Sequence, residues 1–187
     1  VAWVAGDELA LHASLRWQQR HGAWATTVKQ AGALARQDPW ALGSQGSASQ
    51  ALVGLQWTGA AQQSLLIEAW HDGTALSAAD WRRWSTHNRA LANSPAPATA
   101  RAGNLAWQAT PLDGANLQRN SLFARLAWQP DRWQVSLDLL WHPADGGRIV
   151  TAGLQWQGDR WRINAGLRQY GGPTGSVLAQ LPQRRAG

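Results

Sequence analysis

The sequence contains no cysteine and no methionine, and it has only one tyrosine and one phenylalanine in 187 residues. Without cysteine, neither a disulfide framework nor a thiolate metal site can form. Charged residues make up 15% of the chain, which is low against about 25% for a typical soluble domain. No stretch approaches the roughly 18 consecutive apolar residues of a membrane helix. If a membrane is involved, strands must cross it.

Tryptophan, by contrast, is abundant, with 14 copies. Residues 126–137 and 154–165 repeat one pattern, a tight polar turn with a tryptophan on either side. A looser copy follows Trp17, and half a copy precedes Gly59. Amphipathic aromatics at one height are typical of the membrane–water interface of a β-barrel. The predicted interface girdle consists of Trp17, Trp24, Trp57, Trp128, Trp133, Trp156 and Trp161.

Apolar and polar residues alternate strictly through much of the chain, which indicates strands with two different faces. A register shift of one residue would move arginine and aspartate onto the apolar face, so the facing is well specified. A strand of about ten residues, tilted near 45°, crosses about 23 Å. The predicted strands are 1–5, 9–18, 23–35, 50–58, 63–71, 120–129, 132–142, 148–157 and 160–170, with the start of another at 176–181.

The connections alternate in length. Short turns are expected near residues 20, 60, 130 and 158, and mostly longer connections lie between them, an asymmetry typical of outer-membrane barrels. The longest connection, 72–119, contains a capping-box pattern at Ser77 and Asp80, which predicts a helix over about 78–91. Residues 105–109 are interpreted as a strand extension of this long outer loop.

The polar face is the candidate functional surface, and its cations outnumber its anions. Rings of arginine and lysine in a water-filled lumen favour anionic solutes. The alternative is structural: Arg125 or Arg162 would pair with Asp138 across strands and hold a narrow, closed barrel. The lumen-lining candidates are His12, Arg16, Lys29, Glu68, Arg125, Asp138, Arg162, Asn164 and Arg168. Asp80, Arg82, Arg83 and Arg89 of the loop helix could form a constriction, or lie on an exposed helix.

No enzyme motif is present. The five histidines share no metal-ligand spacing, and no Ser/His/Asp set stands out from the polar alternation. The arginines behind the net charge of +6 are scattered and form no dense patch of the kind that binds nucleic acid. We therefore expect no catalysis, no metal, no cofactor and no nucleic-acid partner.

The repeated Trp-turn-Trp hairpins, the alternation and the asymmetry of the loops resemble a bacterial outer-membrane β-barrel, porin-like in broad form. The resemblance implies an all-β, antiparallel, up-and-down transmembrane barrel of about 9–10 strands, formed by residues 1–187 as one domain. It also implies an outer-membrane location in a Gram-negative cell, contact with lipid and lipopolysaccharide, and a homo-oligomer as one option. The chain lacks a leader and a closing strand that ends in an aromatic residue, so we expect a piece of a longer protein.

The favoured function is passive passage or uptake of small solutes, with anions as one candidate class. Three alternatives remain open from the sequence. The barrel could be structural or serve secretion or polysaccharide export, it could embed a hydrolase, or the chain could be a soluble β-barrel that binds a hydrophobic ligand inside. The direction of the apolar face separates the last alternative from the others.

Overall fold

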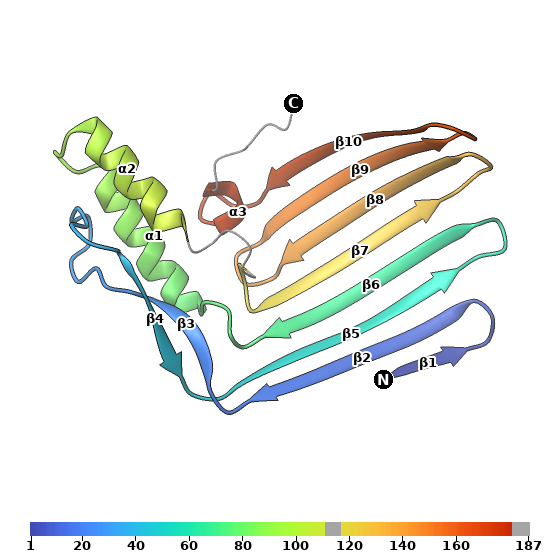
Figure 1. Ribbon diagram of the computed structural model, residues 1–187, viewed down its shortest axis with the longest axis horizontal. Coiled ribbons are helices and arrows are strands. Elements are labelled where there is room, and N and C mark those ends of the chain that lie inside the picture. Colours follow the sequence, from blue (N-terminus) through green and yellow to red (C-terminus); the bar gives the residue numbers. More distant parts are fainter. Residues whose placement is uncertain (111–116, 181–187) are drawn as a thin grey trace. The chain divides into compact units, whose positions relative to one another are not determined.

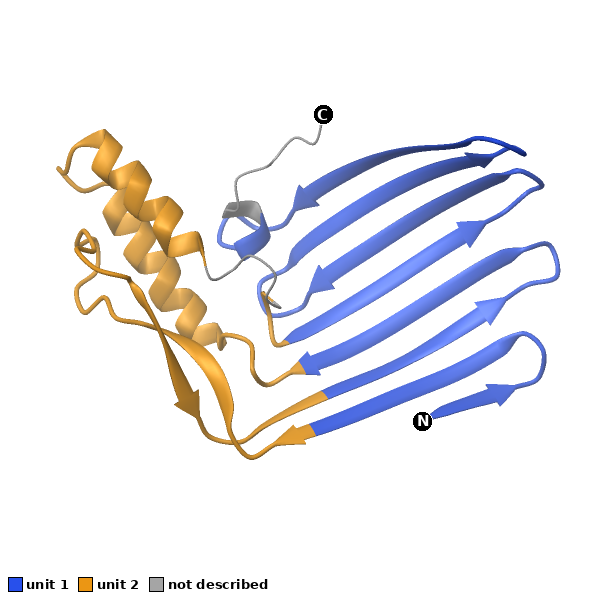
Figure 2. Cartoon of the chain, in the orientation of Figure 1, with its two compact units in different colours: residues 1–16, 51–71, 120–187 blue, residues 17–50, 72–119 orange. Residues whose placement is uncertain are grey.

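The computed structural model describes residues 1–110 and 117–180, which form ten strands and three helices. They divide into two compact units (Figure 2), with unit 1 built from residues 1–16, 51–71 and 120–187 and unit 2 from 17–50 and 72–119. The strands are β1 (Ala2–Ala5), β2 (Leu9–Gln18), β3 (His21–Thr26), β4 (Trp40–Gln45), β5 (Ala48–Thr58), β6 (Gln63–Asp72), β7 (Asn120–Trp128), β8 (Trp133–His142), β9 (Gly147–Gln157) and β10 (Arg162–Gly171). The helices are α1 (Ala78–Ala92), α2 (Ala98–Ala109) and α3 (Val177–Gln180).

Unit 1 is dominated by an eight-stranded sheet in the order β1-β2-β5-β6-β7-β8-β9-β10 (Figure 1). The strand pairs β1–β2, β6–β7, β7–β8, β8–β9 and β9–β10 are antiparallel. The predicted all-β, antiparallel class is therefore confirmed. The described residues do not close into a barrel, because β1 and β10 are the two edges of the sheet.

The register gives this sheet two chemically distinct faces. Leu137 of β8 lies opposite Leu126 and Ala152, whereas the next residue, Asp138, lies opposite Arg125 and Thr151. Because side chains alternate across a strand and directly opposed residues share a face, the separation extends across the ladder. The predicted separation of the two faces is confirmed at β8, since Leu137 and Leu139 lie on one face and Asp138 lies on the other.

The predicted strand at 23–35 is wrong. Only residues 21–26 are extended, as β3, and they pair with β4 in a separate two-stranded sheet. The neighbour of β2 in the large sheet is β5 instead. The chain turns after β3: Gly32 has a positive φ of 78°, and its amide donates to His87 Nδ1 at 3.1 Å. The connection expected at 36–50 accordingly contains a strand, β4.

The predicted loop helix is confirmed as α1. Its N-cap, Ser77, accepts a hydrogen bond from the Asp80 amide, and the Asp80 carboxylate accepts one from the Ser77 amide at 2.9 Å. Burial raises the pKa of Asp80, but the hydrogen bonds from Ser77 and Arg83 outweigh it and leave that pKa below its usual value. The carboxylate therefore stays ionised where the helix dipole favours negative charge.

Two short elements differ from the sequence-based prediction. Residues 105–109 belong to α2, because the alanine-rich segment after Pro97 favours helix, and a proline is well tolerated at a helix start. Instead of a strand beginning at 176, residues 177–180 form α3, whose first amide, of Val177, donates to Asp145 Oδ2 at 2.8 Å. Residue 181, the last of that predicted strand, lies outside the described residues.

The core of unit 2 is small and partly polar. Leu91, Trp81, His87 and Gln108 are buried, with the last two 8% and 1% exposed. The Gln108 carbonyl lies in the last turn of α2, where carbonyls lack an intrahelical partner. It accepts hydrogen bonds from the indoles of Trp40 and Trp84, both at 3.1 Å. Two indole N–H groups thus supply the hydrogen bonds that this carbonyl lacks within its own helix.

Burial lowers the pKa of His87, and a hydrogen bond with the Gln30 backbone opposes this only in part. The unfolded chain binds a proton near the ordinary pKa of 6.5, so it holds more protons than the folded unit just below that pH. Linkage then predicts that unit 2 loses stability as the pH falls from about 7.5 to about 5.5. Urea denaturation followed by helical circular dichroism measures the effect.

The variant His87→Gln should weaken this pH dependence, while the control His21→Gln should keep it. The Asp80 carboxylate does not interfere, because its loss of stabilisation begins only near and below 3.8. Equal stability of the wild-type protein at both pH values would contradict the assignment.

Candidate functional site: a sheet with an apolar and a polar face

The apolar face of the unit 1 sheet is exposed. Leu15, Ile163 and Leu167 are 78%, 62% and 75% exposed. Along β8 every apolar-face residue is exposed, while the polar-face residues from Gln134 to Leu140 are half-buried. Soluble proteins rarely show an apolar patch larger than a few hundred Å². The exposed large apolar side chains of this face include Leu11, Leu15, Val53, Ile67, Leu126, Val135, Leu137, Leu139, Leu154, Ile163 and Leu167.

Tryptophans border the apolar face at the end where the tight turns lie. Trp133 of β8 and Trp156 of β9 are directly opposed, with ring centroids 6.5 Å apart. The Trp128 indole donates to the Ala61 carbonyl at 3.2 Å, and that of Trp57 donates to Glu8 at 3.3 Å. Each of these two rings therefore exposes an apolar body on this face and bonds a polar group near a turn through its N–H.

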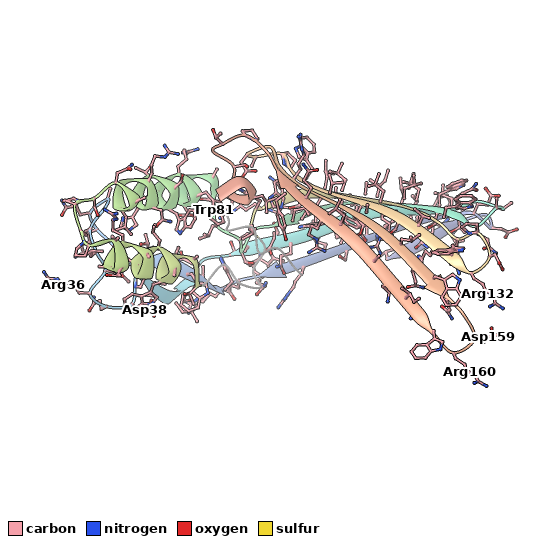
Figure 3. All side chains as sticks on the ribbon, turned by 90° about the horizontal axis from the view of Figure 1, so that it is seen from above. Arg36, Asp38, Trp81, Arg132, Asp159 and Arg160 are labelled. Carbon is pink, nitrogen blue, oxygen red and sulfur yellow. The ribbon has the colours of Figure 1, made fainter. Side chains whose placement is uncertain are left out.

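The turns beyond these rings are charged. Arg132 and Asp159, from neighbouring turns, form an ion pair at 3.3 Å. Arg132, Asp159 and Arg160 lie at the ends of the hairpins, beyond the strands (Figure 3). Trp161, 75% exposed, directly precedes β10. The sequence of layers at this end is thus apolar, then aromatic, then charged.

The predicted girdle needs two corrections. Trp24 lies in β3, outside the large sheet, and Trp17 lies at the carboxyl end of β2, whereas Trp57, Trp128, Trp133 and Trp156 lie beside the tight turns. The turn near residue 20 was wrongly grouped with the others because a tryptophan flanks it on each side. The strand β2 begins at the end of the sheet where the tight turns lie, because the Thr58 amide donates to the Glu8 carbonyl there. Its carboxyl end, with Trp17, therefore lies at the other end of the sheet.

A second aromatic position was missed. Trp141 lies on the apolar face of β8, eight residues after Trp133, and is 40% exposed. At roughly 3.3 Å per residue, the two rings are about 26 Å apart along the strand, which at a tilt near 45° corresponds to about 19 Å in height. The apolar band of an outer-membrane barrel is about 25 Å tall. The sequence already indicated this position, because Trp133 and Trp141 are both odd-numbered residues of one alternating strand and therefore share a face.

The polar face carries two cross-strand contacts between a basic and an acidic side chain. Arg125 of β7 donates two hydrogen bonds, through Nε and a terminal nitrogen, to the two oxygens of Asp138, each at 2.7 Å. This is the ion pair that the structural alternative expected. His12 Nε2 of β2 lies 2.9 Å from Glu68 Oε1 of β6. Both pairs remain partly exposed, so both are within reach of water.

The His12–Glu68 pair extends across an intervening strand. In the sheet, β5 separates β2 from β6, and its Gly54 lies between the two side chains. A Cβ added at Gly54 would come within 2.4 Å of His12 Nε2 and 2.9 Å of Glu68 Cγ. Glycine is therefore required for this contact.

The arginines of β10 bond neutral partners. Arg168 Nε donates to Thr151 Oγ1 at 3.1 Å, and Arg162 donates to Gln157 Oε1 at 2.9 Å. Arg162 therefore contacts a glutamine rather than Asp138, which Arg125 occupies. Because hydroxyl and amide oxygens do not cancel a positive charge, the β9–β10 side of the polar face keeps an excess of it.

Most of the predicted polar-face residues lie on that face, and Asn164 and Arg16 share it by strand alternation. Lys29 does not: it follows β3 in unit 2, a consequence of the shortened strand. Asp80, Arg82, Arg83 and Arg89 all lie on α1. Asp80 serves the capping box and pairs with Arg83, and a constriction role for this helix stays a prediction.

Metal binding and acid–base catalysis are the two other kinds of chemistry to consider in the described part of the chain. No group of three or more metal-ligating side chains occurs there. His12 has an acidic partner, as a general base would, but among the described residues no serine hydroxyl hydrogen-bonds to it. None of the described helices is long and apolar enough to span a membrane.

Comparison with known proteins found no matching family model, no matching curated protein and no matching solved structure.

The close approach at Gly54 predicts a large effect of a single methyl group. Gly54→Ala should destabilise unit 1 by about 1–3 kcal/mol, because the new Cβ collides with His12 and Glu68. The matched control is Gly166→Ala, where the nearest atom is 3.5 Å away and the change should stay within about 0.5 kcal/mol. Urea denaturation followed by tryptophan fluorescence measures both.

The double variant Gly54→Ala/His12→Ala tests the cause of this loss. Removing the imidazole relieves the collision, so the two changes should be strongly non-additive. Additive losses, or a Gly54→Ala variant as stable as Gly166→Ala, would contradict the predicted clash.

Proposed function

We propose that the unit 1 sheet forms the wall of an outer-membrane β-barrel, as the resemblance of the sequence to porin-like proteins implies. Its apolar face contacts lipid, and its polar face lines a water-filled passage for small solutes. The observation that carries the proposal is the orientation of the sheet: its large apolar side chains are exposed on one face and its contacts between basic and acidic side chains lie on the other.

The aromatic positions support a bilayer as the apolar surroundings. Trp133 and Trp141 bound the apolar stretch of β8 at its two ends, with a spacing of about 26 Å along the strand. Indoles prefer the interface between hydrocarbon and water, because the ring is apolar and its N–H is a donor. A protein partner covering this face would not require tryptophans at both ends of a strand.

A barrel also requires both edges of the sheet to be paired, because an open ladder cannot exist in hydrocarbon. The order of the eight strands makes β1 and β10 run in opposite directions, since each neighbour reverses the last. An antiparallel seam can therefore join these edges, either to each other or to further strands. Bacterial barrels with even strand numbers share this property.

Anions are the favoured solute class. Arg162 and Arg168 lie on the polar face with neutral partners, whereas the negative charge of Asp138 is matched by Arg125. A passage lined in this way attracts negative solutes and repels cations. Of the alternatives, a structural or export barrel shares the same membrane placement, while a soluble ligand-binding barrel would need the apolar face turned inward.

The membrane placement is tested with single cysteines, which the cysteine-free chain makes simple to introduce. A fluorophore on Leu137→Cys should be quenched by brominated lipid in reconstituted vesicles, and one on Ser136→Cys by aqueous iodide. These neighbours in β8 lie on opposite faces, so each is the control for the other. The same quenching pattern at both positions would contradict the proposal.

The anion preference is tested by conductance in planar bilayers. The wild-type protein should pass chloride several-fold better than potassium, and Arg168→Gln should reduce that ratio. The control Arg148→Gln removes one positive charge from the apolar face of the sheet, where Arg148 lies opposite Trp141. It should leave the ratio unchanged. A protein that inserts without conducting would refute the pore and leave a structural barrel.

A further inference from the structure

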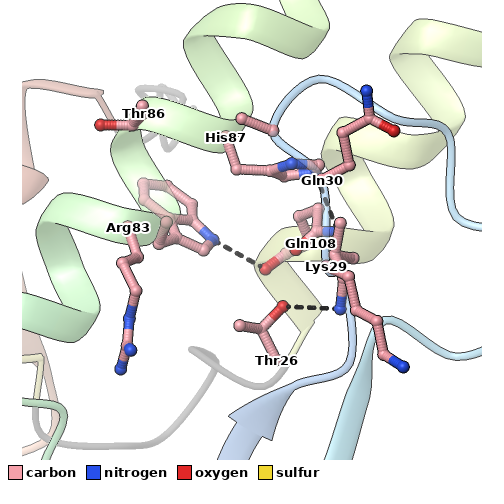
Figure 4. A pocket seen from close by; sticks show the side chains of 10 residues that line it. Thr26, Lys29, Gln30, Arg83, Thr86, His87 and Gln108 are labelled. Carbon is pink, nitrogen blue, oxygen red and sulfur yellow. Dashed lines mark hydrogen bonds between the residues drawn. The ribbon is translucent and has the colours of Figure 1, made fainter.

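Unit 2 contains a pocket that neither the sequence nor the proposed pore accounts for. It has a volume of about 280 Å³ and lies between the segment after β3, helix α1 and the end of α2 (Figure 4). All the lining residues belong to unit 2. The volume lies just below the range of drug-sized ligand sites, so only a small molecule would fit.

The floor of the pocket is fixed by hydrogen bonds. The Trp84 indole donates to the Gln108 carbonyl at 3.1 Å (Figure 4), and Trp81 packs edge-on against it with ring centroids 5.4 Å apart. His87 Nδ1 accepts from the Gly32 amide, and a ring whose nitrogen accepts a hydrogen bond is neutral. The floor is therefore flat, uncharged and held in place before any ligand binds.

The rim of the pocket carries donors and positive charge. Lys29 follows β3 and Arg83 lies on α1, so two different elements supply the cations. Arg83 is held by Asp80, and Lys29 makes no ion pair in the described part of the chain. Thr26 Oγ1 accepts from the Val28 amide at 3.2 Å, which leaves its hydroxyl proton free to donate.

None of the described residues that line the pocket carries a carboxylate. A flat apolar floor beneath a rim of cations and a hydroxyl donor complements an anion with a flat apolar body. We propose that this pocket binds a small organic carboxylate, with its carboxylate at the rim that carries Lys29 and Arg83 and its body against the Trp84 ring. The proposal is independent of the membrane placement, because every residue involved lies in unit 2.

The test is calorimetric titration of the full chain with sodium benzoate, compared with benzyl alcohol, a neutral molecule of similar shape. Benzoate should bind saturably, and benzyl alcohol should bind at least tenfold more weakly, because charge-assisted hydrogen bonds are lost. Lys29→Gln and Arg83→Gln should each weaken benzoate binding about tenfold. Arg82→Gln and Arg89→Gln, on the same helix but outside the lining, are the matched controls.

Lys29→Gln is the decisive variant, because Lys29 contributes to no helix cap and to no ion pair of the described residues. No saturable binding of benzoate, equal binding of benzyl alcohol, or an equal loss in Arg82→Gln would each overturn the proposal. Failure of the lipid-quenching or conductance experiments would leave it intact, so the two proposals can fail separately.

Discussion

The two-residue period of the strands in unit 1 is the constraint on which the rest of the structure depends. It places leucine, valine, isoleucine and tryptophan on one face, and the neighbouring residues on the other. A leucine left exposed instead of buried forgoes about 1.5–3 kcal/mol of hydrophobic stabilisation. The exposed aliphatic side chains of this face are 37–78% accessible, and their summed loss is comparable with the roughly 5–15 kcal/mol that keeps a typical domain folded. Apolar surroundings on this side, as proposed above, would remove that loss.

The polar face depends on the opposite condition, the presence of water. An ion pair such as Arg125–Asp138 would pay a large desolvation cost in a dry interior, which its mutual attraction only partly offsets. Here the arginine side chain is 49% exposed, so it retains much of its hydration. The same applies to Arg162 and Arg168, which bond only neutral oxygens. In the proposed barrel, one sheet would separate lipid from water, and its register decides which side chains meet each.

The sequence predicted best where the interactions are local. The period of β8 and the tight turn between Trp128 and Trp133 involve neighbouring residues, and both the strand and its facing were correct. The capping box at Ser77 is equally local, and α1 was found. The errors lie where distant residues decide: β3 ends early because β4, some 15 residues later, pairs with it. Because of that pairing, Trp24 lies in the two-stranded sheet and Lys29 lies after β3, so neither belongs to the eight-stranded sheet.

The His12–Glu68 contact could not be predicted for the same reason, because residues distant in the sequence decide it. Side-chain alternation put His12 and Glu68 on one face, but their contact depends on Gly54 from a third strand. Strand order was needed as well, since β5, not β3, lies between them. The pocket of unit 2 likewise joins a segment after β3 to α1 and α2, and His87 of α1 lies 55 residues after its hydrogen-bond partner Gly32.

The edges of the sheet follow from the same reasoning. Natural proteins protect an exposed edge strand with proline, with a bulge or with a short length. The strand β10 has ten residues, contains no proline and is paired residue for residue with β9. Its apolar residues are as exposed as those of the inner strands, and its arginines keep to the polar face. Such an edge has the length and side-chain pattern to accept a further antiparallel strand, which would continue both faces of the sheet unchanged.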